Sequence, residues 1–167
     1  MSEPRWLDDH EAHAWRALLW MTHAIDRTLD HQLQRDSQIP HGTYQILVVL
    51  SVSEEQTLPM GVLANSLGWS QSRLSHAVAR MEKTGWVRRI PSSTDKRSNL
   101  AQLTEDGRRK LVEAAPGHVA AARDLVIDAL DPEQLRVLVR ISETVLDRAA
   151  VMLGEDLPFK PFDHSMD

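Results

Sequence analysis

Apolar residues recur at helical spacing along most of this chain, and the interruptions between them divide it into separate elements. Ile25 and Leu29, for example, belong to a series at i, i+3 and i+4 that marks one face of a long helix. Helices are predicted over residues 7–34, 43–53, 60–67, 70–85, 104–130 and 131–153, with a break of the chain at Pro40 and Gly42 and with Thr104 and Asp131 as the N-caps of the last two helices. The fifth contains Pro116 and Gly117, but its apolar phase continues across them, so the sequence predicts a kink near residues 112–116 instead of a break.

Two short helices lie close together in the middle of the chain, and the second has two unlike faces. Ser70 has the hydroxyl expected of an N-cap, and Gly85 closes the helix. Leu74, Val78 and Met81 form a narrow apolar stripe. The other face carries polar and cationic side chains: Gln71, Ser72, Arg73, Ser75, His76 and Arg80. Such a pair of helices is typical of a helix-turn-helix DNA-binding unit.

A small β-wing is predicted directly after this unit. Extended runs cover residues 86–90 and 100–103, with a polar, turn-forming segment over 91–99 between them. Thr57 and Leu58 are expected to add a very short third strand. Arg97 in the turn is suited to a narrow minor groove, where negative potential attracts cationic side chains, and Asp95 is expected to orient its guanidinium.

These motifs resemble the MarR family of winged-helix transcription regulators. The resemblance rests on LANSLGWSQSRLSHAVARMEKTGWVRR, on DKR at 95–97 and on QLTEDG at 102–107, and extends more weakly to IPHGTYQILVVLS and LDPEQLRVL. Val62 departs from the family, which often has an acidic residue there, and Pro59-Met60 replaces its usual Ser or Thr cap. The resemblance implies control by a small ligand, often an aromatic acid or other phenolic compound, and repression as the commoner outcome.

Apolar helices flank the winged unit at both ends of the chain, and a small domain cannot bury all of their apolar surface. We therefore expect a homodimer formed by isologous contact. The expected division is an N-terminal dimerisation helix over 1–38, a winged helix-turn-helix domain over 39–110, and C-terminal dimerisation helices with a tail over 104–167. Phe159 and Phe162 in the tail are expected to dock on the partner. The predicted fold class is mainly α with a small β-wing.

The net charge of −5 conceals a separation of sign along the chain. Residues 70–110 contain ten Lys or Arg against four Asp or Glu, a net charge of +6, and the rest of the chain carries −11. Phosphate binding needs only a local basic patch, because salt screens each charge beyond about 8–10 Å. The separation favours double-stranded DNA as the partner and argues against the alternative of a winged module that binds protein.

Several classes of protein are disfavoured by what the sequence lacks. The chain contains no Cys, which excludes disulfides and thiol-based redox sensing. It has no apolar run of about 18 residues that would predict a membrane span and no secretory signal pattern, so a cytoplasmic location is expected. It has no G-x-S-x-G motif or glycine-rich phosphate loop, so neither an enzyme nor a cofactor is predicted.

The predicted DNA interface divides into base-reading and phosphate-binding residues. Arg73 is suited to a bidentate contact with guanine and Gln71 to one with adenine, and Ser72, Ser75 and His76 share their face. Contacts to the phosphate backbone and the wing contact are expected from Arg80, Arg88, Arg89, Lys96 and Arg97. A dimer would set its two recognition helices roughly 34 Å apart on a palindromic site.

The sequence contains candidate residues for two further kinds of site. The resemblance implies an effector cleft between the dimerisation helices and the winged domain, with candidate lining residues Trp15, Leu19, His23, Tyr44, Leu47 and Val112. A metal-responsive regulator of the same fold is the alternative, because the chain has eight His, among them His10, His13, His23, His31 and His41. With no Cys and no H-E-x-x-H motif, surface histidines are favoured and no metal site is predicted.

Overall fold

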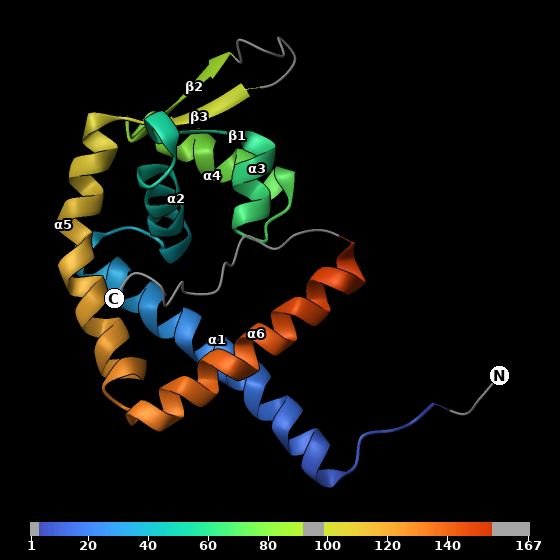
Figure 1. The fold of residues 1–167 in the computed structure, drawn as a ribbon. Coiled ribbons are helices and arrows are strands. Elements are labelled where there is room, and N and C mark those ends of the chain that lie inside the picture. The colour runs from blue at the N-terminus through green and yellow to red at the C-terminus, as the bar shows by residue number, and fades with distance from the viewer. Residues whose placement is uncertain (1–3, 92–98, 155–167) are drawn as a thin grey trace.

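The computed structural model describes residues 4–91 and 99–154 of the chain (Figure 1). In order, its elements are α1 (Asp9–Ser37), α2 (His41–Ser51), the 3-10 turn η1 (Glu54–Gln56), β1 (Thr57–Pro59), α3 (Met60–Ser66), α4 (Gln71–Lys83), β2 (Val87–Pro91), β3 (Asn99–Leu103), α5 (Glu105–Ala122), the π-helical turn η2 (Arg123–Ile127) and α6 (Pro132–Leu153). Helices α2, α3 and α4 gather beneath the sheet, α5 runs along their side, and α1 and α6 extend beyond them (Figure 1). The mainly helical fold class with a small β-wing is confirmed.

Side-chain caps fix the starts of three predicted helices. The Ser70 and Thr104 hydroxyls each accept from the backbone N–H three residues on, at 3.2 and 3.1 Å. The Asp131 carboxylate accepts from the Gln134 N–H at 2.8 Å, and the Gln134 side chain accepts in return from the Asp131 N–H at 2.9 Å. Each cap satisfies an otherwise unpaired helix donor and contributes about 1 kcal/mol. The predicted caps are therefore confirmed.

The junction between α1 and α2 differs from the prediction. α1 continues to Ser37, and Gln38 ends it in the left-handed conformation, with φ of 56°. α2 begins at His41, so Gly42 lies inside a helix instead of breaking the chain. Space requires the glycine there, because a Cβ on Gly42 would lie 2.5 Å from Cη2 of Trp69.

The three strands form one antiparallel sheet in the order β1-β3-β2. Leu58 pairs with Ala101, and Val87 pairs with Leu103. The predicted third strand is therefore confirmed, and it extends to Pro59. The turn predicted between the two longer strands lies outside the described residues over 92–98.

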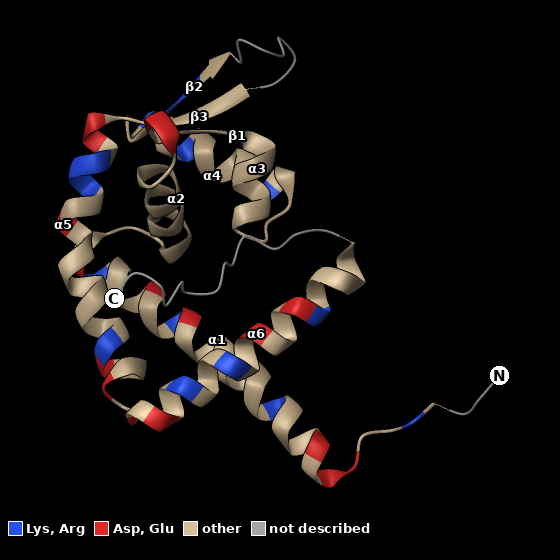
Figure 2. Cartoon of the chain, viewed as in Figure 1, with Lys and Arg blue, Asp and Glu red and all other residues tan. Residues whose placement is uncertain are grey.

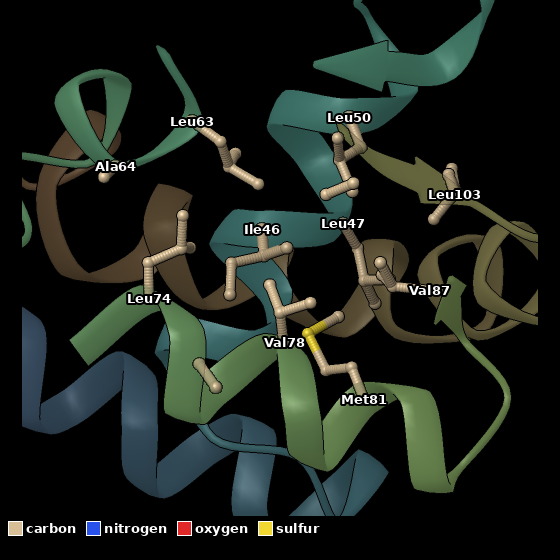
Figure 3. Packing of buried hydrophobic residues seen from close by; sticks show 12 residues of the cluster. Ile46, Leu47, Leu50, Leu63, Ala64, Leu74, Val78, Met81, Val87 and Leu103 are labelled. Carbon is tan, nitrogen blue, oxygen red and sulfur yellow. The ribbon is translucent and has the colours of Figure 1, made fainter. Parts of the chain in front are cut away.

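The main hydrophobic core joins α2, α3, α4 and the sheet (Figure 3). The predicted inward stripe of α4, Leu74, Val78 and Met81, lies in this core with exposed fractions of 0%, 0% and 2%. The residues packed around the stripe come from each neighbouring element: Ile46, Leu47, Leu50, Leu63, Val87 and Leu103. Burying one such side chain contributes about 1.5–3 kcal/mol, so the core strongly favours one orientation of α4.

Gly107 allows α5 to start directly against the residue that precedes β2. A Cβ on Gly107 would collide with the carbonyl oxygen of Trp86, which also accepts from the Thr104 N–H at 3.0 Å. The Thr104 hydroxyl donates to the Gly85 carbonyl at 2.6 Å. The Thr and Gly of the QLTEDG motif therefore join the start of α5 to the end of the helix-turn-helix.

α5 runs without interruption through Pro116, as predicted, and the π-helical turn η2 that follows it was not predicted. The kink near residues 112–116 stays a prediction. Gly117 approaches α1 closely, since a Cβ there would lie 3.0 Å from Nε2 of Gln32. A second core cluster, formed by Leu33, Ile39, Tyr44 and Ala114, joins α1, α2 and α5. This second cluster attaches the long helices to the winged unit.

Two helices leave much of their apolar surface exposed. α6 has no buried residue, and its Ile141 and Val145 are 53% and 50% exposed. On α1, Trp15 and Trp20 are 53% and 70% exposed. Contiguous apolar surface of this kind usually marks an interaction site. No helix within residues 4–91 and 99–154 combines the length and the apolar character needed to cross a bilayer.

Candidate nucleic-acid interface

The polar face of α4 is exposed on the side opposite its buried stripe. The predicted base-reading residues all lie there and are exposed: Gln71, Ser72, Arg73, Ser75 and His76. Because α4 starts immediately after the Ser70 cap, the first three of them occupy its first turn. In helix-turn-helix proteins this end of the second helix contacts base edges. The structure therefore brings the predicted residues together on one accessible surface.

A groove of about 520 Å³ opens beside this face. Its walls come from α3, α4 and all three strands: Pro59, Met60, Gly61, Gln71, Ser72, Ser75, Arg89 and Asn99. The α4 side offers amide and hydroxyl groups, while Met60 adds apolar surface opposite them. Pro59, Met60, Gly61 and Asn99 were not predicted in this groove, because only the fold brings the start of α3 and the ends of β1 and β3 beside the polar face of α4.

Arg89 is engaged with α4 and partly buried. Its Nη2 donates to the carbonyl and hydroxyl oxygens of Ser75 at 2.9 and 3.2 Å. Glu82 accepts from the Arg89 backbone N–H at 3.1 Å and forms an ion pair with its Nε at 3.5 Å. That pair adds Coulomb attraction without a directed bond, since this Nε has no hydrogen-bond partner among the described residues. The guanidinium therefore ties β2 to α4.

The other cations predicted to bind phosphate are placed differently. Arg80 and Arg88 are exposed, and Arg88 Nε donates to Oε1 of Gln102 at 2.7 Å across the sheet. Arg80 also lines a small cleft of about 190 Å³ between α4, the start of α2 and α1. Lys96 and Arg97, with Asp95, lie outside the described residues.

Trp69, which was not among the predicted site residues, lies against Arg73. The Arg73 guanidinium carbon is 3.9 Å from the centroid of the Trp69 ring. This distance is within the range of a cation–π interaction. The i, i+4 spacing of the two residues was the available signal, because such pairs face each other at the start of a helix.

Figure 2 shows Lys and Arg on α4, on β2 and in α5, and Asp and Glu at η1, at the first turn of α5 and at both ends of α1. Within the first turns of α5, Arg108 pairs with Glu105 at 2.8 Å and Arg109 pairs with Asp106. These pairs neutralise much of the charge at that site. The cations best placed to meet phosphates are therefore those of α4 and β2.

Part of the predicted effector cleft lies on the exposed face of α1. Leu19 and His23 line a hollow of about 280 Å³ together with Trp20, whose ring lies edge-on to that of His23 with centroids 6.0 Å apart. Trp15 is one turn closer to the N-terminus and is 53% exposed. This group offers an apolar, aromatic surface to a ligand or a second protein.

The other residues predicted to line that cleft lie elsewhere in the protomer. Leu47 is fully buried in the main core, and Tyr44 is buried in the second cluster with its ring centroid 4.2 Å from that of His118. Val112 is 59% exposed on α5. A single protomer does not bring these three together with the α1 hollow. The helical spacing of apolar residues could not distinguish core residues from cleft residues, because both kinds of site use the same apolar residue types.

The described histidines are not arranged as the metal-responsive alternative requires. Among residues 4–91 and 99–154, no group of three or more His, Asp or Glu is arranged to hold a metal ion. His41 Nδ1 instead lies 2.8 Å from Oδ1 of Asp26, and the His41 backbone N–H donates to Asp30 at 2.8 Å. Burial, with a smaller effect of the nearby His41 ring, lowers the pKa of His118. These contacts join the start of α2 to α1.

Comparison with curated proteins agrees with the resemblance to the MarR family. A model of the MarR family matches residues 37–98. The chain is 33% identical to the HTH-type transcriptional regulator PecS of Dickeya dadantii over 121 residues, which cover 69% of this chain and 70% of PecS. It is 32% identical over 108 residues to the uncharacterized HTH-type transcriptional regulator YfiV of Bacillus subtilis, and the match spans 63% of this chain and 64% of YfiV.

Solved structures extend the similarity over nearly the whole chain. Sco3205, a MarR family transcriptional regulator from Streptomyces coelicolor whose crystal structure was determined in complex with DNA, is 43% identical. The two structures superpose with a TM-score of 0.85, and the match covers 95% of this chain and 99% of that one.

The contacts of Arg89 generate a stability prediction. Arg89→Ala is expected to lower the free energy of unfolding by about 1–2 kcal/mol, because it removes charge-assisted hydrogen bonds from a partly exposed site. Urea denaturation at one protein concentration measures the change. The matched control is Arg88→Ala, on the exposed side of the same strand, which should change stability by no more than about 0.5 kcal/mol. Equal effects of the two substitutions would contradict the positioning role of Arg89.

Proposed function

Because the chain belongs to the MarR family of winged-helix transcriptional regulators, we propose that it binds a palindromic operator in double-stranded DNA as a homodimer and represses transcription. The observation that carries the proposal is α4, whose apolar stripe is buried while its polar face is exposed beside a groove. A helix anchored in this way is available to enter a major groove with its first turn leading.

Base reading is assigned to the exposed face of α4. The Arg73 guanidinium has the fork geometry that matches O6 and N7 of guanine, and the Gln71 amide matches N6 and N7 of adenine. Ser72, Ser75 and His76 lie on the same face and add shorter donors and acceptors. Each good bidentate contact discriminates against a wrong base by about 1–3 kcal/mol.

Phosphate contacts position the protein without specifying a sequence. We assign them to the exposed cations of α4 and β2 and to the wing: Arg80, Arg88, Lys96 and Arg97, with Asp95 orienting Arg97. Arg89 takes another role in this proposal. Its bonds to Ser75 hold β2 against α4, so it positions the recognition helix and contributes only its long-range positive potential to the DNA.

The dimer follows from the apolar surface that one protomer leaves uncovered. α6 buries none of its residues, and Trp15 in the first half of α1 is half-exposed. A two-fold axis would cover both surfaces with their counterparts in a second copy. It would also place two α4 helices roughly 34 Å apart, which matches successive major grooves on one side of a duplex.

Removal of the Arg73 side chain tests base reading. Arg73→Ala is expected to cost about 1–3 kcal/mol of binding free energy on an operator obtained by selection from random duplexes, with base preference relaxed at one position in each half-site. The matched control is Arg80→Ala, which should weaken all duplexes alike and reduce the steepness of the salt dependence. Unchanged operator affinity after Arg73→Ala would refute the placement of α4.

A substitution on α6 tests the dimer. Ile141→Glu combined with Val145→Glu is expected to yield monomers in sedimentation experiments, because it places charges in the surface assigned to the partner. Asp147→Lys, on the opposite side of α6, is the control and should leave the dimer intact. A protein that stays dimeric with both glutamates would show that α6 is not the main contact.

We extend the proposal to a small aromatic acid as the effector. Its ring would occupy the α1 hollow lined by Leu19, Trp20 and His23, and Arg27, which lines an adjoining hollow of about 450 Å³, would pair with its carboxylate. A ligand changes DNA binding only if it favours one dimer geometry over another, and a site on a dimerisation helix can do so. The spacing of the two α4 helices is the property that such a shift would alter.

A reporter under the selected operator tests both repression and release. The wild-type protein should lower expression, and benzoate-type acids should restore it. Trp20→Ala is expected to abolish this response while leaving repression in place, because it removes one wall of the hollow. The control Trp6→Ala changes an exposed Trp outside the hollow and should respond as the wild type does. A response that survives Trp20→Ala would place the effector elsewhere.

A further inference from the structure

Arg73 needs a fixed starting position if it is to read a base. An arginine side chain in water samples many rotamers, and ordering it on binding costs affinity. Arg73 is exposed, yet its guanidinium carbon lies 3.9 Å from the Trp69 ring centroid. A guanidinium stacked on an aromatic face is held in one plane before DNA arrives.

Trp69 is itself held from two sides. Its backbone N–H donates to the Ala64 carbonyl at 2.9 Å, which fixes the turn between α3 and α4. The far edge of its indole meets α2, where a Cβ on Gly42 would lie 2.5 Å from Cη2 and 2.8 Å from Cζ2. The ring is therefore confined between Gly42 and the Arg73 guanidinium.

The support under Trp69 continues to α1. Gly42 follows His41, whose backbone N–H donates to Asp30 and whose ring pairs with Asp26. Trp69, Arg73, Gly42 and both carboxylates line the same cleft of about 190 Å³. The surface that carries the indole is thus anchored to the long N-terminal helix.

We infer that Trp69 is a specificity-determining positioning residue: clamped on Gly42, it orients the Arg73 guanidinium for its base contact. The inference rests on the proposed function and adds to it the residue that prepares the contact. Trp69 is also half-buried at the edge of the main core. A purely structural role would lower stability and weaken all duplexes alike, whereas a positioning role changes the preference at one base pair.

The test is a double-mutant cycle on the full-length protein with the selected operator and its single-base-pair variants. Trp69→Leu is expected to lower operator affinity by about two- to fivefold, the factor that corresponds to an exposed cation–π contact. It should relax preference at the same base pair as Arg73→Ala, and adding it to Arg73→Ala should cost nothing more. Trp69→Phe, which keeps an aromatic face, should restore most of the preference. Additive effects of Trp69→Leu and Arg73→Ala would overturn the inference.

Two further variants separate positioning from packing. Gly42→Ala should displace the indole while Trp69 and Arg73 are both retained, and it is expected to relax preference at that same base pair. Trp86→Leu removes another half-buried Trp of the main core and should reduce stability with the preference profile unchanged. If Gly42→Ala leaves the profile intact, the clamp is refuted while base reading by Arg73 stands. If Arg73→Ala itself leaves the profile intact, the proposed function fails and this inference fails with it.

Discussion

The burial of Leu74, Val78 and Met81 fixes the rotation of α4 about its own axis, and the remaining features of the proposed DNA interface depend on that rotation. Successive residues of a helix are about 100° apart, so a shift by one position would turn Arg73 toward the core in place of Leu74. Burying an unpaired guanidinium costs several kcal/mol or more. The apolar stripe and the polar face therefore favour the same orientation of α4. The side chains that cannot be buried in the core are the ones left exposed toward the groove.

Hydrogen bonds and packing contacts with neighbouring elements hold α4 in this orientation. Arg89 bonds β2 to Ser75 on one side, and the Thr104 cap with Gly107 joins the start of α5 to the segment just before β2. On the other side Trp69 connects α4 to the first turn of α2, which His41 fastens to α1. α4, the proposed recognition helix, is thus connected through Trp69 and α2 to α1, the helix assigned to dimerisation. The second core cluster adds further contacts between α1 and α2.

Local signals in the sequence were sufficient for much of this structure. The caps, the α4 stripe, the short third strand and the exposed polar face were predicted because each depends on neighbours within a few residues. The role of Arg89 was missed, since its partner Ser75 is brought close only by the turn into the wing. The place of Gly42 inside α2 could not be predicted, because the ring that requires a glycine there is contributed by another element. Tyr44 and Leu47 were assigned to a cleft because apolar spacing does not reveal which surface will cover a residue.

If the uncovered apolar side of α6 pairs two copies, as proposed, it affects how the regulator responds to its own abundance. If only the paired form can occupy an operator, then in dilute solution the amount of competent protein rises with the square of the number of chains made. Small changes in synthesis or dilution by growth are then amplified into larger changes in promoter occupancy. The strength of this amplification would depend on α6, which is not assigned any base contact. Sensitivity to protein concentration and choice of operator could then change through separate parts of the molecule.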